Sequence, residues 1–149
     1  MPELNHEHYM RRAIALTAHV PHLPFGAVIV NQEDEAILAE GWNKSDQNPT
    51  WHGEIDAINQ LVLAQGRTGL ILYNAAEPCP MCQGAILWSG IGTVVFGTSI
   101  QFLQQHGWWQ IDLSARELVS RSPRKKCTVP EGVLEQECNA LFLGARTSK

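Results

Sequence analysis

The sequence contains no long apolar run and no apolar leader. Apolar residues make up 44% of its 149 positions, but no run approaches the roughly 18 consecutive apolar residues that span a membrane. The opening residues, MPELNHEHYMRR, are polar and do not contain the apolar core of a signal peptide. We therefore expect a cytoplasmic protein that has no membrane partner.

Charged residues and cysteines are also few. Charged residues amount to 17% and the formal net charge is −4, whereas proteins that grip a long phosphate backbone usually carry a positive field. Nucleic acid is thus a disfavoured partner, but it stays open because the stretch RSPRKK at 121–126 is basic. In a cytosolic chain the four cysteines are expected to stay reduced rather than form a disulfide framework.

The order of predicted elements indicates the fold class. No repeat, low-complexity tract or long linker divides the chain, so we expect a single domain over residues 1–149. Strands are predicted at 25–30 (FGAVIV), 36–42 (AILAEGW), 69–75 (GLILYNA), 92–97 (GTVVFG) and, shorter, 126–129 (KCTV). The first two form a hairpin. The prediction is an α/β fold with three layers (α/β/α), in which helices flank a mixed central sheet of about five strands.

Helices are predicted between these strands. Asn5 caps the first, and one after residue 52 ends near Gly66 and carries an apolar stripe of Ile55, Ile58, Leu61 and Val62. Pro80 suits the first turn of the helix through 81–90. Ser114 caps a helix over 113–121, and a last helix opens at Pro130. The segment between the fourth strand and residue 113 gives a mixed pattern.

The stretch EPCPMC at 77–82 places Cys79 and Cys82 three residues apart at a predicted helix start. Two thiolates on one helical turn suit a borderline-soft metal, and the positive end of the helix lowers a thiol pKa. The same physics serves a redox dithiol. A structural zinc site, with Cys127, Cys138 or another histidine as the fourth ligand, is a third interpretation.

The stretch WHGEI at 51–55 favours a catalytic metal site. His52 opens the preceding helix, so it can meet Cys79 and Cys82 if the two helices pack side by side. Three protein ligands for Zn²⁺, with no fourth evident nearby, leave the open position that a catalytic zinc needs. Glu54 is then a carboxylate that can carry a proton between water and substrate.

Together the two stretches give H-x-E and P-C-x-x-C, the signature of zinc nucleobase deaminases. They read His52-Gly53-Glu54 and Pro78-Cys79-Pro80-Met81-Cys82, and most of the chain resembles the cytidine deaminase-like superfamily. The resemblance implies one zinc ion per chain and hydrolytic deamination of a heterocyclic amine. Hydroxide attacks the carbon that bears the amine, Glu54 shuttles protons, and ammonia leaves. It also implies a homodimer that pairs through the helix after P-C-x-x-C.

Within the superfamily, PFGAVIV, GWN and AEPCPMCQGAILWSGI are most similar to the guanine deaminase and transfer-RNA adenosine deaminase branches. That similarity implies an amide that binds the base, an aromatic side chain packed on the ring, a backbone N–H donor and an acidic contact: Asn43, Phe25, Gly53 and Glu77. Trp51 beside the zinc histidine is either a substrate contact or a packing residue. Trp109, in HGWWQID at 106–112, stacks on the ring as part of a lid or packs at an interface.

Three differences from these branches leave the identity of the substrate undecided. The Gly/Ala-rich segment of transfer-RNA adenosine deaminases is absent after the fourth strand, and the aromatic–Asp–Asp stretch of bacterial guanine deaminases is reduced to Asp112. HGE replaces the commoner HAE and also occurs in fungal-type cytosine deaminases. We expect a free nucleobase or nucleoside as substrate, most similar to guanine. A transfer-RNA adenosine, a pyrimidine, and a non-catalytic zinc-binding module are the alternatives.

Overall fold

The computed structural model describes residues 5–61, 68–123 and 125–147. Four strands form its central sheet in the order β2–β1–β3–β4: β1 (Gly26–Asn31), β2 (Ile37–Trp42), β3 (Leu70–Ala76) and β4 (Thr93–Thr98). β1 runs antiparallel to both β2 and β3, and β3 runs parallel to β4. The sheet is therefore mixed, as the predicted hairpin required.

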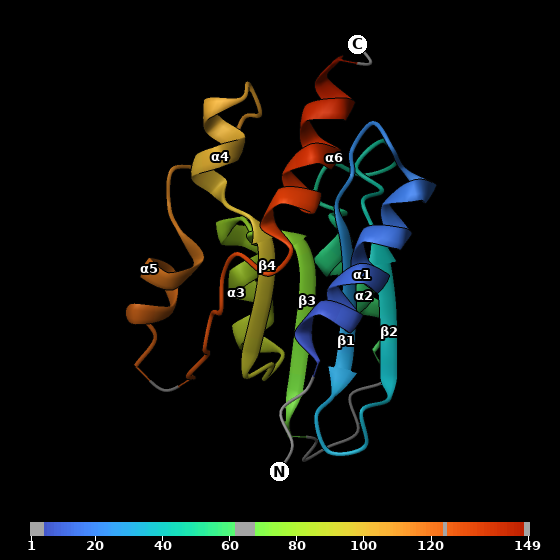
Figure 1. The fold of residues 1–149 in the computed structure, drawn as a ribbon. Helices are drawn as coiled ribbons and strands as arrows, with labels where there is room; N and C mark the ends of the chain where they lie inside the picture. Colours follow the sequence, from blue (N-terminus) through green and yellow to red (C-terminus); the bar gives the residue numbers. More distant parts are fainter. Residues whose placement is uncertain (1–4, 62–67, 124, 148–149) are drawn as a thin grey trace.

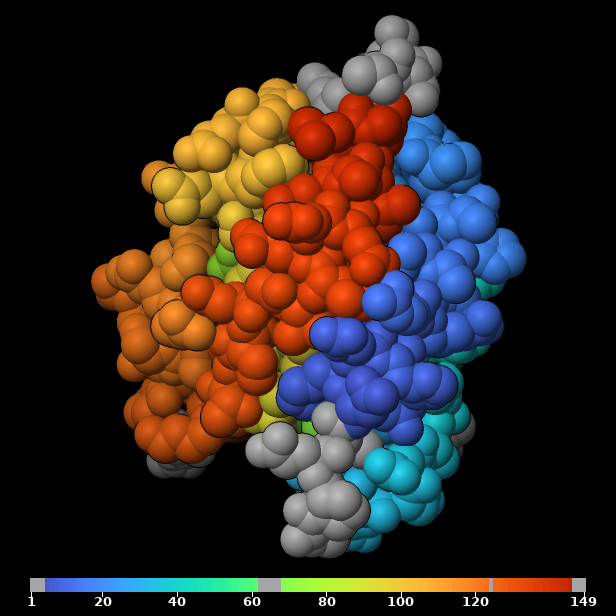
Figure 2. Space-filling model, viewed as in Figure 1, coloured from blue at the N-terminus to red at the C-terminus, as the bar shows by residue number. Residues whose placement is uncertain are grey.

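Helices cover both faces of this sheet (Figure 1). α1 (His6–Leu16) and α6 (Glu135–Thr147) lie on one face, and Figure 2 shows their side chains next to each other there. α2 (Gly53–Gln60) and α3 (Pro80–Trp88) lie on the other face. The predicted three-layer α/β/α architecture is confirmed.

Strand β1 joins the two halves of the core. Val28 and Val30 pack in one cluster with residues of α1, while Ala27 and Ile29 pack in another with Ala57 of α2. All five of its residues from Gly26 to Val30 are buried. A strand that is covered on both faces needs small and β-branched side chains throughout, which the run GAVIV supplies.

The fifth predicted strand is not a strand among the described residues. Around 126–129 the chain makes one isolated bridge, Thr128 to Thr93, beside the outer edge of β4. Thr128 and Pro130 carbonyls accept from Val94 and Phe96 at 2.9 and 3.3 Å. Because Pro130 has no N–H to return a hydrogen bond, the pairing cannot continue as a regular ladder.

Two predicted helices differ in their bounds. α2 ends at Gln60, and Val62 and Gly66 lie outside the described residues. α6 begins at Glu135 rather than at Pro130, because Gly132 and Leu134 take positive φ angles of 76° and 53° that turn the chain before the helix.

Two short helices follow β4 on the side of the sheet away from β1 (Figure 1). α4 (Ile100–Gln105) was not predicted, although Ser99 caps it by accepting from the Phe102 N–H. α5 (Ala115–Ser120) has the predicted cap, Ser114, which accepts from the Glu117 N–H. The predicted Asn5 cap of α1 is also present and accepts from the His8 N–H. A 3-10 turn at Thr17–His19 completes the elements.

In the part of the chain that the structure describes, no helix combines the length and the apolar character that crossing a bilayer requires. In the basic stretch at 121–126, Arg124 falls outside the described residues. Lys125 and Lys126 are exposed.

Candidate active site

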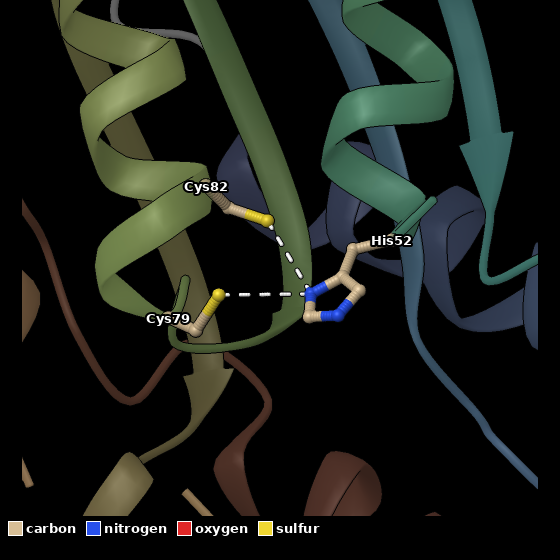
Figure 3. A group of neighbouring side chains, drawn as sticks. All are labelled: His52, Cys79 and Cys82. Atoms are coloured by element: carbon tan, nitrogen blue, oxygen red, sulfur yellow. Dashed lines mark hydrogen bonds between the residues drawn. The ribbon is translucent and has the colours of Figure 1, made fainter. Parts of the chain in front are cut away.

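Three candidate metal ligands meet where α2 and α3 begin. His52 is the N-cap of α2 and Cys79 the N-cap of α3, while Cys82 lies in the first turn of α3 after Pro80. Figure 3 shows the imidazole beside the two sulfur atoms, with its Nδ1 facing both. The His52 Nδ1 lies 3.6 Å from the Cys79 Sγ and 3.5 Å from the Cys82 Sγ. This packing of the two helix starts meets the condition that the sequence analysis set for a shared site.

The spacing of these donor atoms fits zinc. Each ligand atom lies within 4.8 Å of the others. Zn–N and Zn–S bonds of about 2.0 and 2.3 Å at a tetrahedral angle put nitrogen and sulfur about 3.5 Å apart, which is the separation observed. One imidazole and two thiolates are also the donor types that zinc prefers, so the residues fit the ion.

The two thiols differ in their readiness to ionise. A thiolate at Cys79 accepts a hydrogen bond from Cys82 and lies beside His52, which lowers the pKa of Cys79 to about 4. The same hydrogen bond, together with burial, raises the pKa of Cys82. The site therefore offers one ready thiolate at neutral pH, and a bound cation replaces the proton of the second thiol.

The pKa of His52 is raised, first by its hydrogen bond to Cys79 and further by the charge of Glu54 and a hydrogen bond to the Pro49 carbonyl. Because Nδ1 faces the sulfur atoms, the carbonyl partner belongs to the other ring nitrogen. Such an outer partner fixes the tautomer and the ring orientation of a ligating histidine.

Glu54 is a buried acid beside this ligand set. It is the second residue of α2 and only 3% exposed. Burial, and then the negative Cys79 sulfur, raise the pKa of Glu54 to about 7. A carboxyl group with a pKa near neutrality can both accept and return a proton at working pH, as a general acid–base catalyst must.

A cavity of about 550 Å³ opens above these groups. Its floor includes His52, Glu54 and Cys79, and its walls are mostly apolar, with Leu23, Phe25, Trp108, Trp109 and Ile111 among them. Cavities of this size with apolar walls and a few polar groups are typical of small-molecule sites.

Asn43 presents an amide donor to this cavity. Its Oδ1 accepts from the Ser45 N–H at 2.8 Å and the Ser45 hydroxyl at 2.6 Å. A backbone N–H can only donate, so the atom that faces Ser45 must be the carbonyl oxygen. The Nδ2 group is then the part of Asn43 that can meet an acceptor on a ligand.

Phe25 is a part of the cavity wall that is held by neighbouring aromatic rings. Its ring packs edge-on against Trp108 with centroids 5.7 Å apart, and against Phe142 of α6 at 4.9 Å. Gly53 lies directly behind, since a Cβ placed on it would come within 2.9 Å of the Phe25 carbonyl oxygen. The Gly53 position therefore allows no side chain unless the backbone shifts.

Trp51 is held away from this cavity. Its indole Nε1 donates to the Asp56 Oδ1 at 3.0 Å, and its ring lies 5.2 Å from the Lys44 ammonium. Of its two predicted roles, packing is the one that these contacts describe.

Asp56 organises the loop between β2 and α2. Besides Trp51, it accepts from the Lys44 ammonium at 2.7 Å and from the Trp42 N–H at 3.2 Å. The Lys44 ammonium also lies 4.7 Å from the Trp42 ring centre. This loop carries Asn43 at one end and His52 at the other, so the cluster fixes both. Lys44 and Asp56 were not identified from the sequence. An acidic residue on the inward side of the first turn of a helix is the signal that could have indicated Asp56.

Glu77 and Trp109 both line the cavity, but Glu77 is buried and Trp109 is exposed. Glu77 is buried and lines the cavity, but its two oxygens accept from the backbone N–H groups of Ile100 and Ala115. Trp109 is 84% exposed at the mouth, where a flat ring can stack on a ligand.

Known proteins resemble this chain in both sequence and fold. Residues 4–98 match the family described as the cytidine and deoxycytidylate deaminase zinc-binding region. Guanine deaminase of Bacillus subtilis (strain 168) is 43% identical over 95 residues, which cover 58% of this chain. The chain spans about three fifths of that relative's length (60%).

Two further relatives cover more of the chain. The tRNA-specific adenosine deaminase of Buchnera aphidicola is 32% identical over 144 residues, covering 91% of this chain and 85% of the relative. The solved structure of guanine deaminase from Nitrosomonas europaea superposes with a TM-score of 0.82 over 95% of this chain and 84% of that one, at 23% identity. At that identity the superposition supports the shared fold.

Proposed function

The chain belongs to the family of zinc-binding cytidine and deoxycytidylate deaminases, and from this premise we propose that it hydrolyses the exocyclic amine of a free purine base, guanine first. One observation carries the proposal. The buried acid Glu54 lies beside a nitrogen–sulfur ligand set that fits zinc, on the floor of a cavity with aromatic walls. A structural metal site has no use for such a proton carrier.

His52, Cys79 and Cys82 would hold the zinc ion. When bound, zinc lowers the pKa of a water molecule and so supplies the nucleophile for hydrolysis at neutral pH. A carboxylate oxygen of Glu54 takes one proton from the attacking water and delivers it to a ring nitrogen. Glu54 then takes the second proton from the hydroxyl group that the ring carbon has gained, and gives it to the departing amine. The ring carbon gains the oxygen of water and loses the amine as ammonia.

The other cavity residues bind and orient the ring. The Asn43 Nδ2 group donates to an acceptor such as a purine carbonyl oxygen or ring nitrogen. The Phe25 and Trp108 rings provide a rigid apolar wall, and Trp109 can cover the ring from the mouth. Fixing the ring in this way brings its reactive carbon to the nucleophile without the entropy cost of a random encounter.

The lining of the cavity supports an uncharged ring over a phosphorylated substrate. Its polar side chains are amides, a hydroxyl and the carboxyl groups Glu54 and Glu77, together with the metal ligands. Phosphate recognition usually employs Arg or Lys, and carboxylates repel it. A transfer-RNA adenosine is the second candidate, because the 32% identity to a tRNA-specific deaminase extends over most of both chains.

An ammonia-release panel tests the proposed function. The zinc-loaded protein should release ammonia fastest from guanine, and at least about tenfold more slowly from guanosine, adenine, adenosine, cytosine, cytidine and triazine or pterin analogues. A transfer-RNA anticodon stem-loop belongs in the same panel, with rates at two salt concentrations because phosphate contacts weaken as salt rises. Fastest turnover of the stem-loop would replace guanine by the second candidate. If no substrate is turned over, the remaining interpretation is a non-catalytic zinc-binding module.

We also propose a homodimer that pairs through α3. Trp88 on this helix is 81% exposed, and with Leu87 and Leu118 it lines an open apolar groove of about 500 Å³. A large exposed apolar side chain beside an apolar groove is typical of an interface.

Trp88→Glu should weaken the dimer by about 30-fold or more, because a central tryptophan often contributes at least 2 kcal/mol to an interface. Sedimentation velocity measures the change in dissociation constant. Leu143→Glu, an exposed apolar position on α6, is the matched control and should leave the dimer intact. A wild-type protein that sediments as a monomer at high concentration would contradict the proposal.

A further inference from the structure

Glu77 ties together the starts of two helices. Its Oε1 accepts from the Ile100 N–H at 2.9 Å, and its Oε2 accepts from the Ala115 N–H at 2.8 Å. Ile100 is the first residue of α4 and Ala115 the first residue of α5. An ionised carboxylate only accepts hydrogen bonds, and backbone N–H groups at helix starts are its favourable partners.

The chain between these two helix starts forms one wall of the active-site cavity. We call residues 100–115 the wall segment. It contributes Trp108, Trp109, Gln110 and Ile111 to the cavity lining. Its middle is anchored by Trp108, which is buried and packs edge-on against Phe142 with ring centroids 5.5 Å apart. The wall segment is thus fixed at both ends by Glu77 and in the middle by an aromatic contact.

Glu77 is also rigidly connected to the metal site. Its N–H donates to the Thr98 carbonyl at 2.7 Å, which extends the pairing of β3 with β4 by one residue. Only Pro78 separates it from the ligand Cys79, and the proline ring fixes φ at that position. A displacement of Glu77 relative to the wall segment therefore changes the distance between the wall and the metal ligands.

A second cavity lies beside the wall segment. It has a volume of about 900 Å³, and Gln101, Gln104, Arg116 and Glu135 are among its lining residues. Glu77 lines both this cavity and the one above the metal ligands. It therefore forms part of the partition between them.

We infer that Glu77 is a positioning residue, which holds the wall segment at a set distance from the metal ligands and so determines how a substrate ring fits. Each of its oxygens already accepts from a backbone N–H, so this positioning role does not depend on the direct substrate contact expected from the sequence. The kinetic consequence rests on the proposed deaminase function. The two hydrogen bonds from the Glu77 carboxylate to the helix starts, which we call the tether, do not depend on that function.

Glu77→Gln tests the tether with little change in volume. The carboxamide keeps one acceptor but turns an NH₂ group toward the second backbone N–H, so one helix start loses its partner. We expect hydrogen exchange at Ile100 or Ala115 and across 106–111 to accelerate about tenfold or more. Zinc content should stay at the wild-type value. The KM for guanine should rise and kcat/KM should fall by about 10- to 100-fold, as for a misplaced binding wall.

Two variants serve as comparisons. Glu117→Gln makes the same chemical change on α5 at an exposed position and should alter neither exchange in the wall segment nor KM. Ser114→Ala removes only the cap of α5. It should shift exchange and KM in the same direction as Glu77→Gln but by less, and it provides the test if Glu77→Gln does not fold.

Unchanged exchange in the wall segment of Glu77→Gln would overturn the tether, whatever the kinetics. Faster exchange with an unchanged KM would overturn its link to substrate fit. If the wild-type protein deaminates no base, the proposed function fails, but the exchange measurement still decides whether Glu77 holds the wall.

Discussion

Glu54→Ala is expected to abolish ammonia release while leaving a full complement of zinc. The side chain lies beside the ligands and is not needed as one of them, so its removal takes away the proton carrier and spares the metal. General acid–base groups typically contribute 10²- to 10⁴-fold to a rate, and kcat should fall by about that factor or more. Metal analysis and steady-state kinetics on the same preparation measure both quantities.

Glu54→Gln separates proton transfer from simple packing. The amide keeps the shape of the side chain but cannot carry the proton, so its kcat should be as low as that of Glu54→Ala. Glu137→Ala removes an exposed glutamate that pairs with Arg11 on the far side of the sheet, and it should retain wild-type kinetics. Full activity in Glu54→Ala would remove the proton carrier from the mechanism. Loss of zinc together with activity would indicate that Glu54 stabilises the metal site instead.

Cys82→Ser is expected to lose both zinc and activity. Cys82 is fully buried in the first turn of α3, and its Sγ lies 3.5 Å from the His52 Nδ1. A serine hydroxyl is a much harder donor than a thiolate and stays protonated at neutral pH, so it cannot replace the sulfur. Zinc affinity should fall by more than the 10- to 100-fold that is typical of changes in outer-shell partners.

Competition with a chelator, followed by metal analysis, measures this loss of affinity. Cys127→Ser is the matched control, because Cys127 is a half-buried thiol outside the ligand group and should keep wild-type zinc affinity. Adding zinc should also raise the Tm of the wild-type protein and of Cys127→Ser, but not that of Cys82→Ser, since a ligand stabilises only a fold that binds it. Stoichiometric zinc held by Cys82→Ser with unchanged affinity would contradict the ligand set.

The candidate metal ligands could be identified from the sequence because their geometry is mostly local. Cys79 and Cys82 share one helical turn, and Pro80 marks where that turn begins. The single long-range assumption was that α2 and α3 start side by side, which the sequence analysis used as a condition. The strands could be predicted equally well, because apolar runs such as FGAVIV indicate strands that are buried on both faces.

The supports of the site could not be predicted, because they depend on contacts between residues far apart in the sequence. Glu77 meets Ile100 and Ala115 only after β3 and β4 have paired. Asp56 has nearer partners, Trp42, Lys44 and Trp51, but they meet it only through the path that the loop between β2 and α2 takes. The apolar stripe expected on α2 is also only partly right. Ala57 is fully buried, but Ile58 is half-exposed because Glu54 and Asp56 occupy the inner face.

The glycine of HGE has a structural explanation in this fold. From the sequence, HGE in place of HAE kept a pyrimidine substrate open. In the structure, a Cβ at position 53 would meet the Phe25 carbonyl oxygen at 2.9 Å, and that oxygen also accepts from the Asn43 N–H. Close backbone packing is thus sufficient to explain this glycine, and HGE alone does not decide between a purine and a pyrimidine ring.

The separation of the ligands along the chain makes zinc affinity a gauge of correct folding. His52 and Cys79 are 27 residues apart, and β3 lies between them in the core of the sheet. An unfolded chain keeps the cysteine pair but loses the histidine, so it retains at most a weak two-sulfur site. Tight zinc binding should therefore distinguish correctly folded preparations of any variant from misfolded ones before any activity is measured.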